Sequence, residues 1–127
     1  ADLHSPSISS KLMRQKPDLI INVSLWSLQD KNTYGKLTPY NIGTSQTTKL
    51  TQARALENQC HYIYCNYADK TTYTHKSGKE ASLTSIGNSM IVNPYGEIIS
   101  KVDNEKEQVL FSQLNLKRNH WENLEYY

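Results

Sequence analysis

Two cysteines, Cys60 and Cys65, are the residues of this chain best suited to covalent or metal chemistry, because a thiolate is both a nucleophile and a metal ligand. A C-x4-C pair is not a zinc spacing, and the sequence holds no second pair. His61 and His75 could add ligands, but His61 lies between the two cysteines at the start of an expected strand. A nucleophilic cysteine also needs a base or a positive environment. Free cysteine is more often a small buried side chain, so we predict two buried cysteines and no metal site.

The sequence shows neither the motif of a serine hydrolase nor that of a phosphate-binding site. Ser89 is preceded by one glycine in "IGNSM" but followed by none, so the G-x-S-x-G pattern of serine hydrolases is missing. Glycine-rich phosphate-binding loops are missing too. Arg54 and Glu57 stand three positions apart on an expected helix, a spacing that favours a structural ion pair. The residues alone therefore show no complete catalytic constellation.

The bulk composition excludes several classes of protein. The chain has 127 residues, the size of one domain at most, and 14 Lys and Arg against 12 Asp and Glu. This near-neutral net charge is too small to indicate the clustered basic face that nucleic-acid-binding proteins need. No apolar run approaches the roughly 20 residues that cross a bilayer, and "ADLHSPSISS" does not resemble a signal peptide. We expect a cytoplasmic protein without disulfides, and its short apolar runs indicate part of a larger domain.

The pattern of the first half predicts two α/β units. Ser5 followed by Pro6 predicts a helix start. The apolar run 19–23 predicts a strand that is covered on both faces and extended by Leu25 and Trp26. The polar stretch 27–43 is long enough to be functional. Thr44 or Ser45 is expected to begin a second helix that ends near Cys60.

The second half predicts strands joined by turns. We expect a strand over 61–68, a polar loop over 69–82 and a hairpin over 88–102. Asn93-Pro94-Tyr95-Gly96 fits a type I turn in that hairpin. A last strand is expected over 108–116, and the tail could be a short helix or an arm. Together these elements predict an α/β fold with a mixed sheet.

Three segments together resemble the nitrilase (carbon–nitrogen hydrolase) superfamily. "QARALENQCHYIYCN" looks like its R-A-x-E-N helix leading into a strand that ends in Asn, and "GNSMIVNPYGEII" is similar to its G-x-S-x-I-V-x-P-x-G-E hairpin, with Asn93 in place of the usual Asp. The opening resembles the segment after the family's nucleophile, except that Ser5 replaces an aromatic residue and Ser7 a Glu. The positions that match the helix, strand and hairpin motifs are Arg54, Glu57, Asn66, Gly87, Ser89, Pro94 and Gly96.

The resemblance implies a fold and a place within it. The family fold is a four-layer α-β-β-α sandwich, in which two mixed sheets pack face to face with helices outside. Residues 1–127 would be the C-terminal half of this single domain, with the N-terminal half absent from the sequence. Such a half should expose the strand edges and faces that meet the other half.

The resemblance also implies where the chemistry lies. The nucleophilic cysteine is expected immediately before Ala1, and the Glu and Lys of the mechanism lie further upstream, so no catalytic side chain belongs to this chain. The backbone N–H of Ala1 would help to bind the oxyanion. The candidate substrate-pocket residues follow the nucleophile or end the first strand, and they are His4, Ser5, Ser24, Leu25 and Trp26.

The implied function is hydrolysis of non-peptide C–N bonds in amides, carbamoyl compounds or nitriles by a Cys-Glu-Lys mechanism. This chain alone would be inactive. Its expected partners are the small-molecule substrate, the N-terminal half and a second copy in a homodimer, with no cofactor, nucleic acid or membrane. Two alternatives stay open: an acyltransferase or glutamine amidohydrolase with the same triad, and a non-catalytic scaffold. The residue before Ala1 separates an enzyme from a scaffold.

Overall fold

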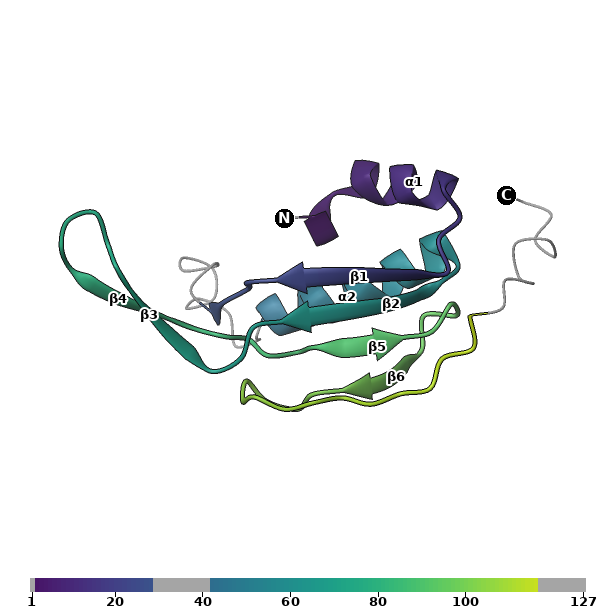
Figure 1. Cartoon of the computed structure of the whole chain (residues 1–127). Coiled ribbons are helices and arrows are strands. Elements are labelled where there is room, and N and C mark those ends of the chain that lie inside the picture. Colours follow the sequence, from purple (N-terminus) through teal and green to yellow (C-terminus); the bar gives the residue numbers. More distant parts are fainter. Residues whose placement is uncertain (1, 29–41, 117–127) are drawn as a thin grey trace.

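A four-stranded mixed sheet forms the centre of the chain, with strands in the order β1-β2-β5-β6 (Figure 1). The structure is a computed structural model that describes residues 2–28 and 42–116. A second, two-stranded sheet joins β3 to β4. In chain order the elements are η1 (Asp2–His4), α1 (Pro6–Arg14), β1 (Leu19–Ser24), α2 (Ile42–Asn58), β2 (His61–Asn66), β3 (Lys70–Thr74), β4 (Glu80–Thr84), β5 (Met90–Val92) and β6 (Ile98–Lys101).

The register of the sheet follows from its connections. β1 and β2 are parallel, with Leu19 opposite His61 and Ser24 opposite Asn66. A parallel pair needs a long crossover, which α2 provides. β2 pairs with β5 and β5 with β6 in antiparallel fashion. The predicted α/β class with a mixed sheet is confirmed.

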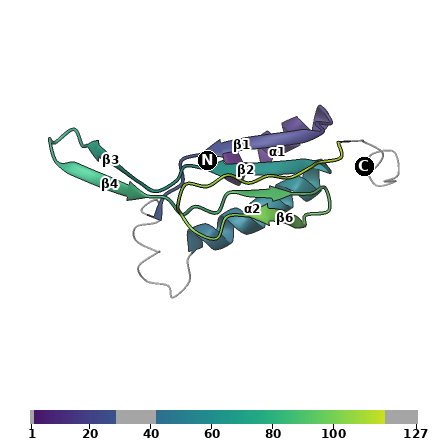
Figure 2. The ribbon, with the colours of Figure 1, turned by 60° about the horizontal axis from the view of Figure 1, so that its bottom comes forward.

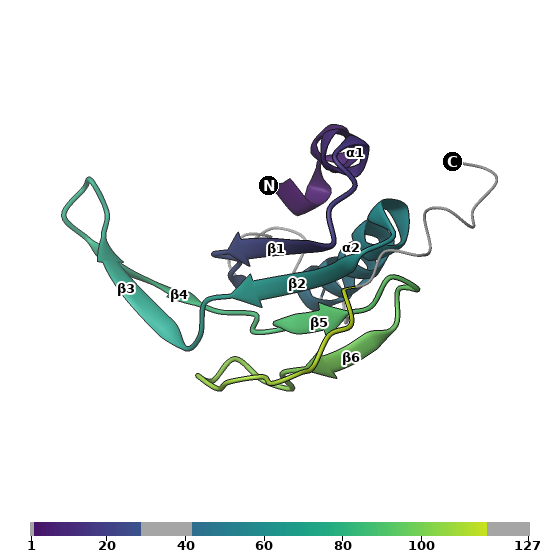
Figure 3. The same cartoon turned by 45° about the vertical axis from the view of Figure 1, so that its right-hand side comes forward.

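Both helices lie on one side of the sheet (Figure 3). α1 packs against α2, and α2 packs against β2 and β5. The start of α1 follows the prediction, since Ser5 occupies the N-cap position and Pro6 is the first residue of the helix. The Ser5 side chain makes no capping hydrogen bond to the helix backbone, because its hydroxyl lies 3.0 Å from that of Ser7. The buried core under the helices includes Leu3, Ile20, Trp26, Ala55, Cys60, Tyr62, Tyr64, Met90 and Val92.

The opposite face of β1 is open within the described chain, which corrects the prediction of a strand covered on both faces. Ile21 is 59% exposed, Val23 80% and Leu25 65%. Side chains alternate along a strand, and the helices cover only the face of Ile20. For the same reason Cys65 is exposed, since it alternates with buried Tyr64 in β2, so its predicted burial is wrong. Cys60 is buried as predicted.

The polar stretch 69–82 is a strand ribbon and not the predicted loop. β3 and β4 pair from Lys70 opposite Thr84 to Thr74 opposite Glu80, and the ribbon projects from the body of the molecule (Figure 2). The threonines and the tyrosine of β3 are strong strand formers, and Gly78 at the tip of the ribbon has φ +82°. The sequence predicted a loop because the stretch is polar, and β3 is exposed along its whole length while β4 is mostly half-buried.

Three further boundaries differ from the prediction. α2 begins at Ile42, before both predicted caps, and β1 ends at Ser24, before Leu25 and Trp26. No strand forms over 103–116, where one was predicted for 108–116. Most of the predicted loop 27–43 and the tail from 117 onward lie outside the described residues. Among the helices that the structure describes, none has the length and apolarity to cross a membrane.

The β5–β6 hairpin is confirmed with the predicted turn. The N–H of Gly96 donates to the carbonyl of Asn93 at 3.0 Å, which closes the turn. The Asn93 side-chain oxygen accepts from the N–H groups of Tyr95 at 2.9 Å and Glu97 at 3.0 Å. Gly96 has φ +77°, a conformation that favours glycine.

Candidate functional site

Asn66 connects the carboxyl end of β2 to both neighbouring strands. Its side-chain oxygen accepts from the N–H of Trp26 at 2.8 Å, and its amide nitrogen donates to the carbonyl of Trp26 at 2.9 Å and to that of Gly87 at 3.1 Å. The side chain is buried, at 8% exposure for the residue. The Asn66 amide therefore joins the chain after β1 to the chain before β5, beside the direct contact from the N–H of Ile86 to the carbonyl of Trp26 at 3.3 Å. This is the edge where ligands bind in α/β sheets.

Two serines complete this cluster. The Ser89 hydroxyl accepts from the N–H of Asn66 at 2.9 Å. The Ser85 hydroxyl donates to the carbonyl of Tyr67 and accepts from the N–H of Gly87 at 2.8 Å. Neither hydroxyl contacts a basic side chain in these hydrogen bonds. Both bond to backbone groups, so they lack the arrangement of a nucleophilic serine with its base.

Trp26 stands next to His4 at this end of the sheet. Their ring centroids are 4.7 Å apart at an angle of 38°. Trp26 is only 7% exposed and belongs to the core, whereas His4 is exposed and Ser5 and Ser24 are partly exposed. The structure thus brings His4 and Trp26 together, while Leu25 is 65% exposed.

Arg54 joins α2 to η1 and, through Glu57, to α1. Its Nε donates to the carbonyl of Leu3 at 3.0 Å, and its Nη1 lies 2.8 Å from both carboxylate oxygens of Glu57. Glu57 also accepts from the Ser9 hydroxyl at 2.7 Å. The Asn58 amide donates to the same hydroxyl at 2.9 Å. The predicted ion pair is thus confirmed, and its arginine is buried, at 6% exposure.

The residues that hold these contacts belong to segments with recognisable relatives. Residues 1–120 match the sequence profile of the carbon-nitrogen hydrolases. The chain belongs to the carbon-nitrogen hydrolase family. Its fold is an α/β fragment that matches part of the nitrilase fold.

Three relatives of this chain illustrate the match. It is 30% identical over 76 residues to the nitrilase and fragile histidine triad fusion protein NitFhit of Caenorhabditis elegans. The matched region covers 60% of this chain and 15% of that protein. A carbon-nitrogen hydrolase from Helicobacter pylori G27 superposes with a TM-score of 0.69 at 20% identity, over 94% of this chain and 39% of that one. An amidase from Nesterenkonia sp. AN1, solved after Michael addition of acrylamide at its active-site cysteine, superposes with a TM-score of 0.55 at 17% identity, over 96% of this chain and 40% of that one.

The chain spans less than half the length of each of these relatives. Of the family positions found in the sequence, Asn66, Gly87 and Ser89 meet in one cluster, Arg54 and Glu57 in another, and Pro94 and Gly96 in the β5–β6 turn. Ala1 lies outside the described residues. Sequence reasoning missed the roles of Leu3, Ser9 and Ser85, because their partners are distant in the chain; Leu3 and Arg54 are 51 positions apart.

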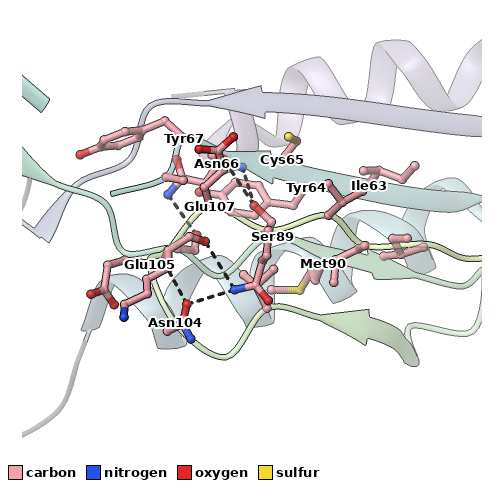
Figure 4. A pocket seen from close by; sticks show the side chains of 18 residues that line it. Ile63, Tyr64, Cys65, Asn66, Tyr67, Ser89, Met90, Asn104, Glu105 and Glu107 are labelled. Atoms are coloured by element: carbon pink, nitrogen blue, oxygen red, sulfur yellow. Dashed lines mark hydrogen bonds between the residues drawn. The ribbon is translucent and has the colours of Figure 1, made fainter. Parts of the chain in front are cut away.

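A cavity of about 430 Å³ lies between the open face of β2 and β5 and the segment that follows β6 (Figure 4). Its walls are mostly apolar, with Cys65, Ser89 and Glu107 among the polar contributors. The backbone N–H of Asp69 donates to the carbonyl of Glu105 at 2.6 Å, which holds the covering segment at one end. The sequence did not predict this cavity, because residues 104–110 were expected to form a turn and a strand.

The described residues hold little further ionisable chemistry. Burial lowers the pKa of His61 below the ordinary range of histidine, because desolvation disfavours the charged imidazolium. Within residues 2–28 and 42–116, no three His, Cys, Asp or Glu side chains gather closely enough to share a metal ion.

Proposed function

We propose that this chain is the C-terminal half of a hydrolase of non-peptide C–N bonds in amides, carbamoyl compounds or nitriles. The match of residues 1–120 to the carbon-nitrogen hydrolases carries the proposal. The active-site cysteine of the structurally similar Nesterenkonia amidase supports it. The nucleophilic cysteine would directly precede Ala1, and a Glu and a Lys would come from the upstream half.

The proposed reaction follows from these groups. The Glu takes the thiol proton, because the thiolate is the attacking species. The sulfur adds to the amide carbon, and the Lys and the backbone N–H of Ala1 stabilise the negative oxygen. The C–N bond then breaks, and ammonia or an amine leaves with a proton from the Glu. Water finally hydrolyses the thioester to release the acid and restore the thiol.

The topology supports this position for the nucleophile. α1 and α2 lie on the same side of the sheet (Figure 3). Strand-helix-strand crossovers are right-handed, so a strand before α1 would lie beside β1 on the edge that is unpaired in the described chain. Parallel strands end at the same edge, so this strand would deliver its last residue beside η1, near His4 and Trp26. The open face with Ile21 and Val23 would then meet the second sheet.

We predict that the 127-residue chain alone hydrolyses no amide, because it lacks the attacking sulfur and the proton acceptor. The longer polypeptide that includes the upstream half should release ammonia from simple aliphatic amides. Replacing the cysteine before Ala1 with alanine should abolish that release. Ammonia release assayed side by side for the three proteins tests the proposal. Turnover by the isolated chain, or a residue other than cysteine at that junction, would refute it, and the second result would favour a scaffold.

Val23→Lys tests whether the open face meets the upstream half. Val23 is 80% exposed on β1, so a lysine there should leave the folding of the isolated chain unchanged. In the proposed sandwich the same ammonium would be buried without a partner, at a cost of about 3 kcal/mol or more. Binding to a co-expressed upstream half should therefore weaken about 100-fold, as measured by co-purification and titration.

Tyr95→Lys is the matched control, since Tyr95 is 74% exposed in the β5–β6 turn and away from the open face. It should leave binding to the upstream half unchanged. Equal binding by the Val23→Lys chain and the wild-type chain would show that the open face meets something else.

The mass of the complete protein in solution tests the proposed homodimer.

A further inference from the structure

We propose that Arg54 is a positioning residue, whose buried guanidinium fixes the η1 turn that directly follows Ala1 in the chain, the residue whose backbone N–H is proposed to bind the oxyanion. The inference rests on the proposed function, because it assigns Arg54 a role in that same site. Leu3, whose carbonyl Arg54 holds at 3.0 Å, comes two residues after Ala1. Arg54 contacts the backbone and no proposed reacting atom, so its effect would pass through the position of the turn.

The η1 turn needs an external support. It has only three residues, and short 3₁₀ turns have poor hydrogen-bond geometry of their own. Leu3 supplies support of two kinds: its side chain is in the core, at 3% exposure, and its carbonyl accepts from Arg54. The first fixes how deep the turn sits, and the second fixes how its peptide planes are oriented.

Arg54 is itself held in one orientation. Its Nη1 lies 2.8 Å from both oxygens of Glu57, while its Nε points to Leu3. Glu57 is held in turn by the hydroxyl of Ser9 at 2.7 Å, from α1. The planar guanidinium makes both contacts at fixed angles, which a lysine ammonium cannot reproduce. The network therefore transmits the placement of α1 and α2 to the turn.

Arg54→Lys separates positioning from charge and burial. Lysine keeps the positive charge beside Glu57 and loses the fixed contact with the Leu3 carbonyl. Small displacements of an active-site group cost up to about 100-fold in rate, and loss of an oxyanion donor costs about 100- to 1,000-fold. We expect kcat of the complete protein to fall about 10- to 100-fold, with KM within about twofold of wild type, because the donor acts on the charge that develops in the transition state.

Gln52→Ala is the matched control, because Gln52 lies on the same helix and also donates to a backbone carbonyl, that of Gly96, at 2.8 Å. It should leave kcat unchanged. Hydrogen exchange of the Leu3 and His4 amides should accelerate in Arg54→Lys and stay at the wild-type rate in Gln52→Ala. All assays are run on the complete protein well below the melting temperature of either variant, so that unfolded protein does not contribute.

The outcomes separate this inference from the proposed function. A wild-type protein that hydrolyses neither amides, carbamoyl compounds nor nitriles would refute both. An active wild-type protein would leave the proposed function standing, and the inference would then fail if Arg54→Lys kept its kcat, if it raised KM at constant kcat, or if the exchange of the η1 amides did not change. It would fail equally if Gln52→Ala lowered kcat as much as Arg54→Lys.

Discussion

Gly87→Ala is expected to lower the free energy of unfolding by about 3 kcal/mol. Gly87 has φ +62°, a conformation that costs other residues about 1–2 kcal/mol. An alanine Cβ would overlap the carbonyl oxygen of Asn104 and lie 2.8 Å from its carbonyl carbon and 3.0 Å from Cα of Glu105. These are backbone atoms, which cannot rotate aside, so the segment after β6 would have to move away from the sheet.

Two other glycines of the chain separate the cost of the backbone conformation from the cost of the steric overlap. Gly78 has φ +82° with nothing within 4 Å of an added Cβ, so Gly78→Ala should cost only the backbone strain, about 1 kcal/mol. At Gly96, where φ is +77°, the added Cβ would lie 2.9 Å from the side chain of Leu56, which can shift. Gly96→Ala should therefore fall between the other two.

The measurement is urea denaturation followed by circular dichroism, at a protein concentration where light scattering finds no self-association. The order of the midpoints should be Gly78→Ala highest, then Gly96→Ala, then Gly87→Ala. Equal midpoints for Gly78→Ala and Gly87→Ala would mean that the contact with Asn104 contributes nothing. In that case the cavity beneath residues 104–110 (Figure 4) would not depend on Gly87.

The sequence predicted those elements whose signals are local. Ser5 and Pro6 marked the start of α1, and Asn93-Pro94-Tyr95-Gly96 marked the hairpin turn, because each signal acts within four residues. The path of residues 103–116 could not be predicted in the same way. Its apolar residues resemble a strand, yet Phe111 is 86% exposed. Whether such a segment pairs depends on the rest of the sheet, which its own residues do not encode.

The same distinction holds for the candidate site. The spacing of Arg54 and Glu57 revealed their ion pair, because both lie on one helix. The contact from Arg54 to Leu3 joins residues 51 positions apart, and no local pattern announces it. The exposure of Cys65 depended on which face of β2 the helices cover, and alternation alone does not decide that.

Asn66→Asp should be the most damaging change at the end of the sheet, with a loss of about 4 kcal/mol at pH 7. Asparagine supplies one acceptor for the N–H of Trp26 and donors for the carbonyls of Trp26 and Gly87. A carboxylate keeps the acceptor and loses every donor. Both carbonyls would then face a buried negative charge, which costs more than an unmade neutral hydrogen bond.

The pH dependence identifies that charge as the cause. Burial and the two carbonyls should raise the pKa of the introduced carboxyl above the usual range of aspartate. The unfolded chain keeps the ordinary value, so the native state binds more protons between the two values and the variant gains stability as pH falls. Urea midpoints at pH 7 and pH 5, each relative to wild type at the same pH, should therefore show a smaller loss at pH 5.

Asn22→Asp is the matched control on the neighbouring strand β1. Asn22 is only partly buried and makes one long hydrogen bond, from its amide to the hydroxyl of Tyr62 at 3.3 Å, so its loss should not exceed about 1 kcal/mol. Equal losses for the two variants would mean that Asn66 contributes no more than an ordinary strand asparagine. If the stability loss of Asn66→Asp is large and does not shrink at pH 5, its cause is the lost hydrogen-bond geometry and not the buried charge. If the predicted pattern holds, the uncharged amide of Asn66 reinforces the backbone contacts between the segment after β1 and the segment before β5, because it donates to both carbonyls and accepts from the N–H of Trp26 without placing a charge there.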